Sequence, residues 1–421
     1  MELKKYRLGE IVDFNKETIS RQDNLLEIKY LDTSNILDNV IYETPSMKLS
    51  EAPSRAQRKV KHLTIIYSTV RPRLKHHGIL QMPPENLIVS TGFATLDIKD
   101  SYENMIDATY LYLLLTQSSV TEYLGNIADT AVSAYPSINP SDISSLSFIF
   151  PDITIQRKIA SIWTSYDQKI HLNSVINDNL EAMAKQLYDY WFVQFDFPNE
   201  EGKPYKSSGG AMVYNERLKR EVPIAWEVEN LIDFAEIKNG ATPSTADEAN
   251  YGGDIVWITP KDLSDQQSKF VYQGERNITK QGFDSCSTSM LPTNSVLMSS
   301  RAPIGLVSIA KHEVCTNQGF KGFIPKSISD SIYLYYYIKH HIKQIEQLGT
   351  GTTFKEVSRD DLCKFPILTI GAKDIYVQWI ELQNGIADKQ LALTKEIAAL
   401  TKQRDELLPL LMNGQASVNS D

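Results

Sequence analysis

The sequence predicts an α+β protein made of two tandem β-rich domains, each followed by a long helix. Three observations lead to this prediction: a length of 421 residues, a series of short β-type runs that occurs twice, and two extended heptad-like patterns. A chain of this length accommodates two or three domains of ordinary size. We expect the two long helices to pair as an antiparallel coiled coil, which would give the chain pseudo-two-fold symmetry.

The β-type runs follow the same order in both halves of the chain. The first half contains YRLGEIVDF (6–14), IKYLDTSNI (28–36), TIIYSTVRPRL (64–74), LIVSTGFATLDI (87–98), YLYLLLT (110–116) and YPSINPSDISSLSFIFP (135–151). The second half contains WEVENLIDFAEI (226–237), IVWITPKDL (255–263), VLMSSRAPIGL (296–306), CTNQGFKGFIP (315–325), YLYYYIK (333–339) and TFKEVSRDDLCKFPIL (353–368). Short β-branched or aromatic runs between turn residues are typical of a compact β-rich domain. Each half also predicts one helix, starting near Tyr110 and Tyr333, and a short one after Asn139 and Ser358.

One phrase of the repeat contains Gly-Phe, in NLIVSTGFATLDI (86–98) and in EVCTNQGFKGFIP (313–325). We expect the two phrases to occupy the same structural position, with both phenylalanines in the core and glycine allowing a bend or a close approach. The polar pairs just before them, Ser90-Thr91 and Asn317-Gln318, differ between the copies. These pairs are candidates for the residues that distinguish what each copy binds.

Two long segments show apolar residues at a spacing of three or four. They are Ile155, Ile159, Ile162, Tyr166, Ile176, Leu180, Met183, Leu187 and Tyr190 in the first, and Trp379, Leu382, Ile386, Leu393, Ile397, Leu400, Leu407 and Leu411 in the second. DQKIHLNSVI (167–176) is also similar to DKQLALTKEI (388–397). Repeated heptads favour a coiled coil, in which each stripe would cover the other. Two unrelated amphipathic helices, each packed on its own domain, are the alternative.

The segment NEEGKPYKSSGGAMVYNERLKREV (199–222) is polar, contains glycine and has no hydrophobic period, so it predicts a linker loop. The expected organisation is a first β-rich domain at 1–151, a central spacer helix at 152–198, a linker loop at 199–225, a second β-rich domain at 226–370, a C-terminal spacer helix at 371–414 and a tail at 415–421.

The net charge of −9, taken alone, disfavours a nucleic-acid partner. The charges are unevenly distributed, however, because residues 52–84 contain no Asp or Glu but many basic residues and histidines. A solvated basic face is the simpler explanation, yet such faces normally include acids for pairing. The run therefore favours a surface that faces phosphates.

Two equivalent loops, STVRPRLKHHG (68–78) and SSRAPIG (299–305), combine hydroxyl, Arg and Pro residues. Arg can bind guanine with two hydrogen bonds, and Ser or Thr can bind bases or phosphates. Alternatively, Pro and Gly set the turn geometry and the arginines are merely exposed. The candidate DNA-binding residues come from the basic run, these loops, the polar pairs and the less basic second half: Arg55, Arg58, Lys59, Lys61, Ser68, Thr69, Arg71, Arg73, Lys75, His76, His77, Ser90, Thr91, Lys261, Ser299, Ser300, Arg301, Asn317, Gln318 and Lys321.

No catalytic motif is found. The sequence has no GxxxxGK[ST] loop and no GxGxxG after a predicted strand. MPPE (82–85) lacks the Asn or Asp and the aromatic residue of a base-amine methyltransferase turn, and the histidines lack metal-ligand spacing. The chain by itself is therefore predicted not to be an enzyme, and we predict no catalytic or metal-binding residue.

Three scattered cysteines without CxxC spacing are expected to be free thiols in a reducing compartment. No apolar run approaches 18 residues, and the N-terminal MELKKYRLGEIVDF lacks a signal-peptide core. We therefore expect a cytoplasmic protein without a membrane segment.

Residues 167–198, DQKIHLNSVINDNLEAMAKQLYDYWFVQFDFP, and the following segment up to 231 resemble the central region of specificity subunits of type I restriction–modification systems. LTKQRDELLPLLMNGQASV (400–418) resembles the family's second characteristic region. The layout of the resemblance covers the whole chain, but its specific motifs lie in the helical regions. VPIAWEV (222–228) departs from the pattern, since many relatives have glycine just before the tryptophan.

The resemblance implies a subunit without catalysis, in which each β-rich domain is a target-recognition domain for one half of a bipartite, asymmetric double-stranded DNA site. The spacer helices would set the gap and dock two modification (methyltransferase) subunits, to which restriction (translocase/nuclease) subunits are added. S-adenosylmethionine, ATP and Mg²⁺ are expected on those partners, and no cofactor on this chain.

Trp191, Phe192, Phe195 and Arg404 are candidates for the partner interface. The aromatic residues are equally open to a core role, and Arg404 to a role in helix register. Two other functions also stay open: a cryptic nuclease or methylase, which would bind S-adenosylmethionine alone, and a structural coiled-coil scaffold, which would not bind DNA even with its partner.

Overall fold

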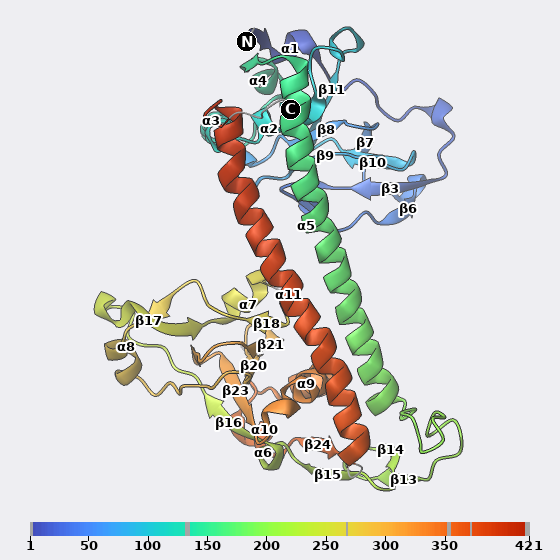
Figure 1. Cartoon of the computed structure of the whole chain (residues 1–421), viewed down its shortest axis with the longest axis vertical. Coiled ribbons are helices and arrows are strands. Elements are labelled where there is room, and N and C mark those ends of the chain that lie inside the picture. Colours follow the sequence, from blue (N-terminus) through green and yellow to red (C-terminus); the bar gives the residue numbers. More distant parts are fainter. Residues whose placement is uncertain (1–2, 131–134, 267, 352–354, 371–372, 417–421) are drawn as a thin grey trace. The chain divides into compact units, whose positions relative to one another are not determined.

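The computed structural model describes the chain except for residues 1–2, 131–134, 267, 352–354, 371–372 and 417–421. The chain divides into two compact units, of which the first comprises Met1–His171 and Ala398–Asp421 and the second Leu172–Ile397. Each unit contains one β-rich domain and one segment of each long helix (Figure 1). The predicted fold class, α+β with two tandem β-rich domains and two long helices, is confirmed.

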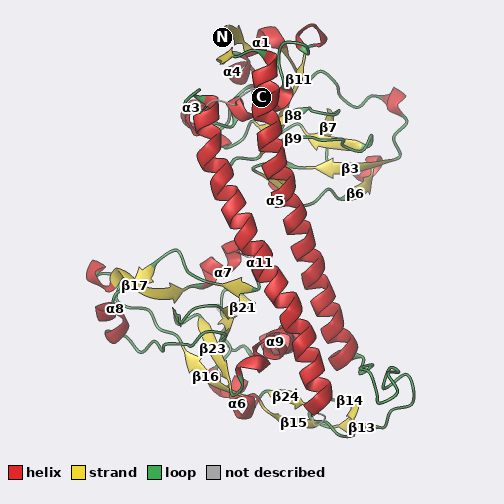
Figure 2. Ribbon diagram, viewed as in Figure 1, coloured by secondary structure: helices red, strands yellow, loops and turns green. Residues whose placement is uncertain are grey.

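The first unit contains two four-stranded sheets, in the orders β2-β11-β8-β9 and β6-β3-β10-β7 (Figure 2). The strands of these sheets are β2 (Val12–Phe14), β11 (Phe93–Ile98), β8 (Ile65–Ser68), β9 (His77–Ile79), β6 (Ser46–Lys48), β3 (Glu27–Leu31), β10 (Leu87–Ser90) and β7 (Ala56–Lys59). Two further antiparallel pairs are β1 (Lys4–Arg7) with β12 (Ser147–Phe150), and β4 (Ile36–Leu37) with β5 (Val40–Ile41). The helices are α1 (Leu8–Ile11), α2 (Ala108–Leu115), α3 (Ser118–Asp129) and α4 (Pro140–Ser144).

The second unit contains a five-stranded sheet, in the order β16-β23-β20-β21-β18, and a three-stranded sheet, in the order β19-β17-β22. The strands are β16 (Ala235–Asn239), β23 (Phe320–Pro325), β20 (Val296–Ser300), β21 (Ile304–Ala310), β18 (Phe270–Val271), β19 (Asn277–Ile278), β17 (Tyr251–Ile258) and β22 (Cys315–Thr316). A further pair is β15 (Glu227–Asn230) with β24 (Pro366–Thr369). The helices are α6 (Leu231–Phe234), α7 (Pro260–Gln266), α8 (Lys280–Asp284), α9 (Ser331–Leu348) and α10 (Arg359–Lys364).

The two β-rich domains share the same strand register around the Gly-Phe phrase. Phe93 of β11 lies opposite Ser68 of β8, and Phe320 of β23 lies opposite Ser299 of β20, both in antiparallel pairs. Both phenylalanines are completely buried, at 0% exposure, as predicted. The preceding strands also match, since β10 runs parallel to β3 and β22 runs parallel to β17. The duplication predicted from the sequence is therefore a duplication of structure.

The two copies differ in their helices. The single helix predicted near Tyr110 is two helices, because α2 ends where the Thr116 hydroxyl donates to the Tyr112 carbonyl and α3 starts at Ser118. In the second unit α9 continues without a break. The short helices after Asn139 and Ser358 form as predicted. At the first, the Asn139 amide donates to Asp142 Oδ2, and at the second, the Asp361 amide donates to the Ser358 hydroxyl.

The long helices are α5 (Ile153–Tyr188), which continues as a π-helical turn over Asp189–Val193, and α11 (Lys373–Met412). In the first unit Ile159 and Leu411 share a core cluster, and Arg404 Nη1 lies 3.7 Å from Asp167 Oδ1. Later positions in α5 thus meet earlier positions in α11. The helix segments of this unit are antiparallel.

The helix segments of the second unit are also antiparallel. Gln390 Nε2 donates to Glu181 Oε2 at 3.2 Å, and Gln383 Nε2 donates to the Ala184 carbonyl at 2.8 Å. The helices also pack on the β-rich domain, because Trp379 is fully buried in the same core as the tyrosines of α9. The alternative of helices that pack only on their own domains is therefore wrong.

The segment 199–225, predicted as a linker loop, contains a hairpin of β13 (Met212–Asn215) and β14 (Arg220–Pro223). Its hydrophobic pattern is weak because Val222 and Pro223 are buried, whereas Val213 and Tyr214 are exposed. The Arg220 guanidinium lies 4.4 Å from the centre of the Phe195 ring, which holds the hairpin on the end of the helix.

We expect Phe93→Ala and Phe320→Ala each to lower the free energy of unfolding by about 3–5 kcal/mol, because each leaves a cavity in the hydrophobic core of its unit. Urea unfolding with hydrogen exchange should place the loss in the first unit for Phe93 and in the second for Phe320. Tyr123→Ala, at an exposed position of α3, is the control. An unchanged midpoint for either phenylalanine variant would contradict its place in the core.

Candidate nucleic-acid interface

In the first unit, three loops converge on Gly92. Both the Thr69 amide and its hydroxyl donate to the Gly92 carbonyl at 2.9 Å. A Cβ atom at Gly92 would lie 3.0 Å from Thr33 Cγ2, so glycine permits the close approach of the loop after β3. The Thr91 amide donates to the Arg55 carbonyl at 2.8 Å, which brings in the basic run.

In the second unit, the corresponding loops converge on Gly319. The Ser300 amide donates to the Gly319 carbonyl at 2.7 Å, and a Cβ atom at Gly319 would lie 3.1 Å from Pro260 Cγ. Asn317 Oδ1 accepts a hydrogen bond from the Gly319 amide at 2.9 Å, and the Val357 amide donates to the Ser300 carbonyl. In both units, the loop after the strand paired with the Gly-Phe phrase and the loop after the parallel-paired strand, β3 or β17, therefore meet at the glycine, but they present different side chains.

Arg55, Arg71 and Lys75 are exposed near this convergence. Lys61 is also exposed, but it lies by Thr64 and Asp97, at the other end of β11 from Gly92. The Arg71 backbone has a positive φ of 47°, and its amide donates to the Pro136 carbonyl. The Arg71 guanidinium lies 5.4 Å from the centre of the exposed Tyr135 ring. Tyr135 was not among the predicted residues, although it opens the segment that pairs with this loop.

Two other predicted basic residues are engaged in ion pairs within the unit. Arg73 binds Asp129 at 2.6 Å and Glu122 at 3.0 Å, and these hydrogen bonds raise its pKa. Gly125 makes room for the contact, since a Cβ atom there would lie 2.6 Å from Arg73 Cζ. Lys59 binds Asp23 at 2.7 Å, and this hydrogen bond raises its pKa. Both side chains thus have a structural role in addition to any contact with DNA.

Arg58, Thr69, Thr91 and His76 are half-buried. Arg58 lies on β7, where burial lowers its pKa. His76 Nδ1 lies 2.6 Å from the Ile36 carbonyl oxygen. A DNA contact by these side chains stays a prediction.

The structure corrects the prediction for the residues whose side chains are buried: Ser68, His77, Ser90, Ser299, Ser300 and Lys321. The Ser68 hydroxyl donates to the Val70 carbonyl at 2.9 Å, and the Ser299 hydroxyl donates to the Pro303 carbonyl at 2.6 Å. Lys321 is paired with Glu356 at 3.2 Å. These side chains support the loops from inside and do not face solvent. Sequence spacing alone could not distinguish the two faces.

The candidates of the second unit that reach solvent, with Arg301 half-buried among them, have acidic or polar neighbours. Lys261 pairs with Glu275 at 2.8 Å, and Arg301 Nη1 lies 3.7 Å from Glu356 Oε2. Gln318 is exposed and accepts a hydrogen bond from the Thr242 hydroxyl. The resulting surface is polar with balanced charges, unlike that of the first unit.

A groove that the sequence analysis missed lies beside Lys261. It has a volume of about 780 Å³ and includes Gln273, Asn277 and three glycines in its lining. The Arg276 guanidinium lies over the Tyr251 ring at 4.2 Å, which holds it in the groove. The signal available in the sequence was Arg276 in the glycine-containing segment QGERN (273–277).

The three aromatic residues proposed for a partner interface are core residues. Trp191, Phe192 and Phe195 are buried, and the Phe192 ring contacts Trp226 and Trp379 edge-on or at a tilt. The prediction of a partner contact is therefore wrong for them, since no buried ring is available to another protein. They join the end of α5 to the second β-rich domain.

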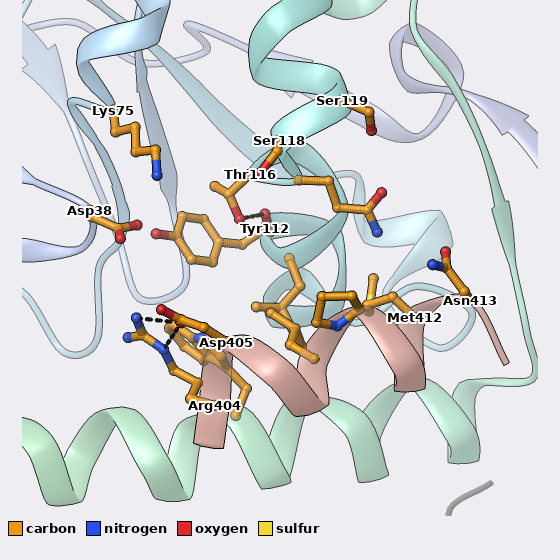
Figure 3. Close-up of a pocket in the computed structure, with 15 residues that line it drawn as sticks. Asp38, Lys75, Tyr112, Thr116, Ser118, Ser119, Arg404, Asp405, Met412 and Asn413 are labelled. Carbon is orange, nitrogen blue, oxygen red and sulfur yellow. Dashed lines mark hydrogen bonds and ion pairs between the residues drawn. The ribbon is translucent and has the colours of Figure 1, made fainter. Parts of the chain in front are cut away.

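Arg404 lines a cavity of about 560 Å³ in the first unit (Figure 3). Its guanidinium lies 2.9 Å from Asp405 Oδ1 and 3.7 Å from Asp167 Oδ1. Lys75 and Asp38 also line the cavity. Charges of both signs therefore meet in this cavity. The helix-register role considered for Arg404 agrees with its contact to α5, and a partner contact stays a prediction.

Among the described residues, no group of three or more His, Cys, Asp or Glu side chains is placed to hold a metal ion. Within the same part of the chain, every helix is too short or too polar to cross a membrane.

The geometry defines a class of protein: a duplicated scaffold that presents two different sets of loop residues from one framework. The chain belongs to the type I restriction modification DNA specificity domain family, which matches residues 1–182 and 223–409. It is therefore a non-catalytic DNA-recognition subunit of a type I restriction–modification system, and its partners are DNA and the other subunits of such a system.

Similar proteins agree with this assignment. The chain is 27% identical to the type I restriction enzyme HindI specificity subunit of Haemophilus influenzae, over 98% of this chain and 99% of that one. It is 42% identical to the MjaIX specificity subunit of Methanocaldococcus jannaschii over 34% of this chain and 33% of that one. The fold is similar to the crystal structure of an S subunit from M. genitalium, with a TM-score of 0.59 at 14% identity over 97% of this chain and 96% of that one.

The buried His77 makes the stability of the first unit depend on pH. His77 stacks on Tyr67, its Nδ1 lies 3.1 Å from the Tyr112 hydroxyl, and burial lowers its pKa to about 4. The unfolded chain binds a proton near pH 6.5, whereas the folded unit does not until about pH 4. The contribution of neutral His77 to the free energy of unfolding is therefore fully present above pH 6.5, and it is lost as the pH falls toward 4.

We expect this loss to reach about 3 kcal/mol, and His77→Phe to remove it while retaining the ring stack. Urea unfolding at several pH values between 7.5 and 4 measures both curves. The variant should lose less stability than the wild type as the pH falls. Parallel curves would show that His77 is not the group responsible.

Proposed function

We propose that this chain reads a bipartite, asymmetric DNA target, with each β-rich domain contacting one half-site. The observation that carries the proposal is the matched convergence of loops on Gly92 and Gly319 around unlike exposed side chains. A shared framework gives both domains the same mode of approach to the duplex. Unlike side chains on that framework then select unlike half-sites.

In the first domain, we assign base reading to Arg71 and phosphate binding to Lys61 and Lys75. Arg71 is exposed, and the Tyr135 ring beside its guanidinium restricts the side chain. A restricted guanidinium is suited to the two acceptors of guanine in the major groove. Exposed lysines supply the part of the affinity that does not depend on sequence and that decreases with salt.

In the second domain, we assign base reading to Asn317, Gln318, Arg301 and Arg276. Amide side chains can bind adenine with two hydrogen bonds, and arginine can bind guanine. Because acidic residues pair with Lys261 and Arg301, this domain has a weaker positive field. Its affinity should therefore rely more on direct base contacts and less on phosphates.

In this proposal, two modification subunits dock on the long helices. Restriction subunits join the complex through the modification subunits. Support comes from an apolar stripe at helical spacing on the solvent face of α5, formed by Leu172, Val175, Ile176 and Met183. S-adenosylmethionine, ATP and Mg²⁺ belong to those partners in this proposal, and the assembled complex works in the cytoplasm.

Methylome sequencing of a host that expresses the chain with its modification subunit tests the proposal. Two unlike half-sites separated by a fixed gap are expected. Gel-shift measurements at several salt concentrations show whether the complex prefers that sequence. A complex that binds DNA without sequence preference would overturn the proposal.

We expect Arg71→Ala to weaken recognition of one half-site by about 1–3 kcal/mol and to spare the other, with Arg301→Ala doing the reverse. Methylation rates on targets with single-base changes in each half-site measure the effect. Lys61→Ala is the matched control and should weaken binding to all targets uniformly. If Arg71→Ala reduced both half-sites equally, the loop would be a phosphate clamp.

The length of the helices should set the gap. The 40 residues of α11 span about 60 Å, which is less than two DNA turns of about 34–36 Å. Inserting one heptad into residues 155–190, with a matching heptad in α11, lengthens both helices by about 10 Å, or about three base pairs.

The preferred gap should shift by that amount in a methylation assay with a series of gap lengths. A seven-residue insertion in the turn between β13 and β14 is the control and should leave the gap unchanged. An unchanged gap after the paired helix insertion would show that the helices do not act as a ruler.

A further inference from the structure

Lys269 lies just before β18, and its side chain is only 5% exposed. Its ammonium donates to the Tyr336 hydroxyl of α9 at 2.7 Å and to Gln390 Oε1 of α11 at 3.3 Å. It also lies 3.4 Å from Glu181 Oε2 of α5. One buried cation of the recognition domain thus contacts both long helices within the second unit.

The Glu181 carboxylate completes a closed network. Its Oε2 atom accepts hydrogen bonds from the Tyr336 hydroxyl at 3.0 Å and from Gln390 Nε2 at 3.2 Å. The Lys269 ammonium also lies 4.6 Å from the centre of the Tyr336 ring. Burial lowers the pKa of Lys269 to about 8, and the neighbouring Glu181 carboxylate opposes this shift.

Stability alone does not require such a network. Burying an ion pair costs desolvation energy, and apolar residues of similar volume are often neutral or stabilising in its place. Apolar packing is non-directional, however, and tolerates sliding or rotation of the packed elements. Hydrogen bonds to an ammonium and a carboxylate lose strength when their geometry changes. The network therefore favours one orientation of the domain on the helices.

The first unit contains a comparable network built from other residues. Asn39, in the turn between β4 and β5, donates from Nδ2 to Asp167 Oδ2 of α5 at 3.0 Å. Arg404 of α11 lies 3.7 Å from the same carboxylate, and burial raises the pKa of Asp167. In each unit one α5 carboxylate thus joins the recognition domain to both helices.

We propose that Lys269 and Glu181 are positioning residues that fix the orientation of the second recognition domain on its helices and thereby set how strictly the gap between half-sites is measured. This inference rests on the proposed bipartite recognition. It concerns neither base identity nor overall affinity, so half-site preference should not depend on it. Gap selectivity is the property that the network controls.

Lys269→Met tests the inference in the assembled complex with modification subunits. The substrates carry both natural half-sites with gaps from two base pairs shorter to two base pairs longer than the natural one. We expect the preference for the natural gap over its one-base-pair neighbours to fall about tenfold, while base preference within each half-site is retained. Glu181→Gln should produce a smaller loss, and it carries the test if Lys269→Met does not fold.

Lys339→Met is the matched control, because Lys339 lines the same cavity as Lys269 and Glu181 but donates to the Tyr335 hydroxyl of its own helix, α9. It should keep the wild-type gap profile. The double variant Lys269→Glu with Glu181→Lys should recover part of the selectivity. An unchanged gap profile in both Lys269→Met and Glu181→Gln would overturn the inference, and so would an equal loss of gap preference in Lys339→Met. A wild-type complex without any gap preference would instead overturn the proposed function.

Discussion

The close backbone approach at Gly92 and Gly319 is the constraint on which both recognition domains depend. Each glycine carbonyl accepts a hydrogen bond from the loop of the paired strand, and the position of a Cβ atom would be only 3.0 or 3.1 Å from the neighbouring loop. The fully buried Phe93 and Phe320 follow directly and fix the strands behind the loops. Side chains on the outer side of the loops can then change without disturbing the framework.

The first domain uses its basic residues in two ways. Arg73 and Lys59 form ion pairs with acids from other elements. The pair with Asp129 ties the loop to α3, and the pair with Asp23 ties β7 to the turn at Arg21–Asp23. Arg71, Lys61 and Lys75 remain exposed. A net charge of −9 therefore coexists with a local positive surface, because the field at the loops depends on nearby unpaired charges and not on the total.

The sequence predicted the features that depend on periodic patterns. Repeated β-type runs identified the duplication, and heptad spacing identified α5 and α11 to within a few residues. Features that depend on distant partners were not predictable: Arg73 meets Asp129 only after folding, and the same holds for Lys269 and Glu181. Burial of Ser68 or Phe192 likewise depends on which face of a strand or helix meets the core. The hairpin at 212–223 was missed because it buries little apolar surface.

The proposed role of the helices in setting a gap requires a fixed register as well as a fixed length. An apolar seam alone permits several registers of similar energy, since its contacts have no direction. Buried Gln383 and Gln390 reach across to the Ala184 carbonyl and the Glu181 carboxylate, and Arg404 reaches Asp167. A shift by one turn would break these bonds and leave buried polar groups without partners, at a cost of about 1–3 kcal/mol each. Polar residues in the seam thus reduce the number of allowed registers, which is the role that a single buried polar residue has in other coiled coils.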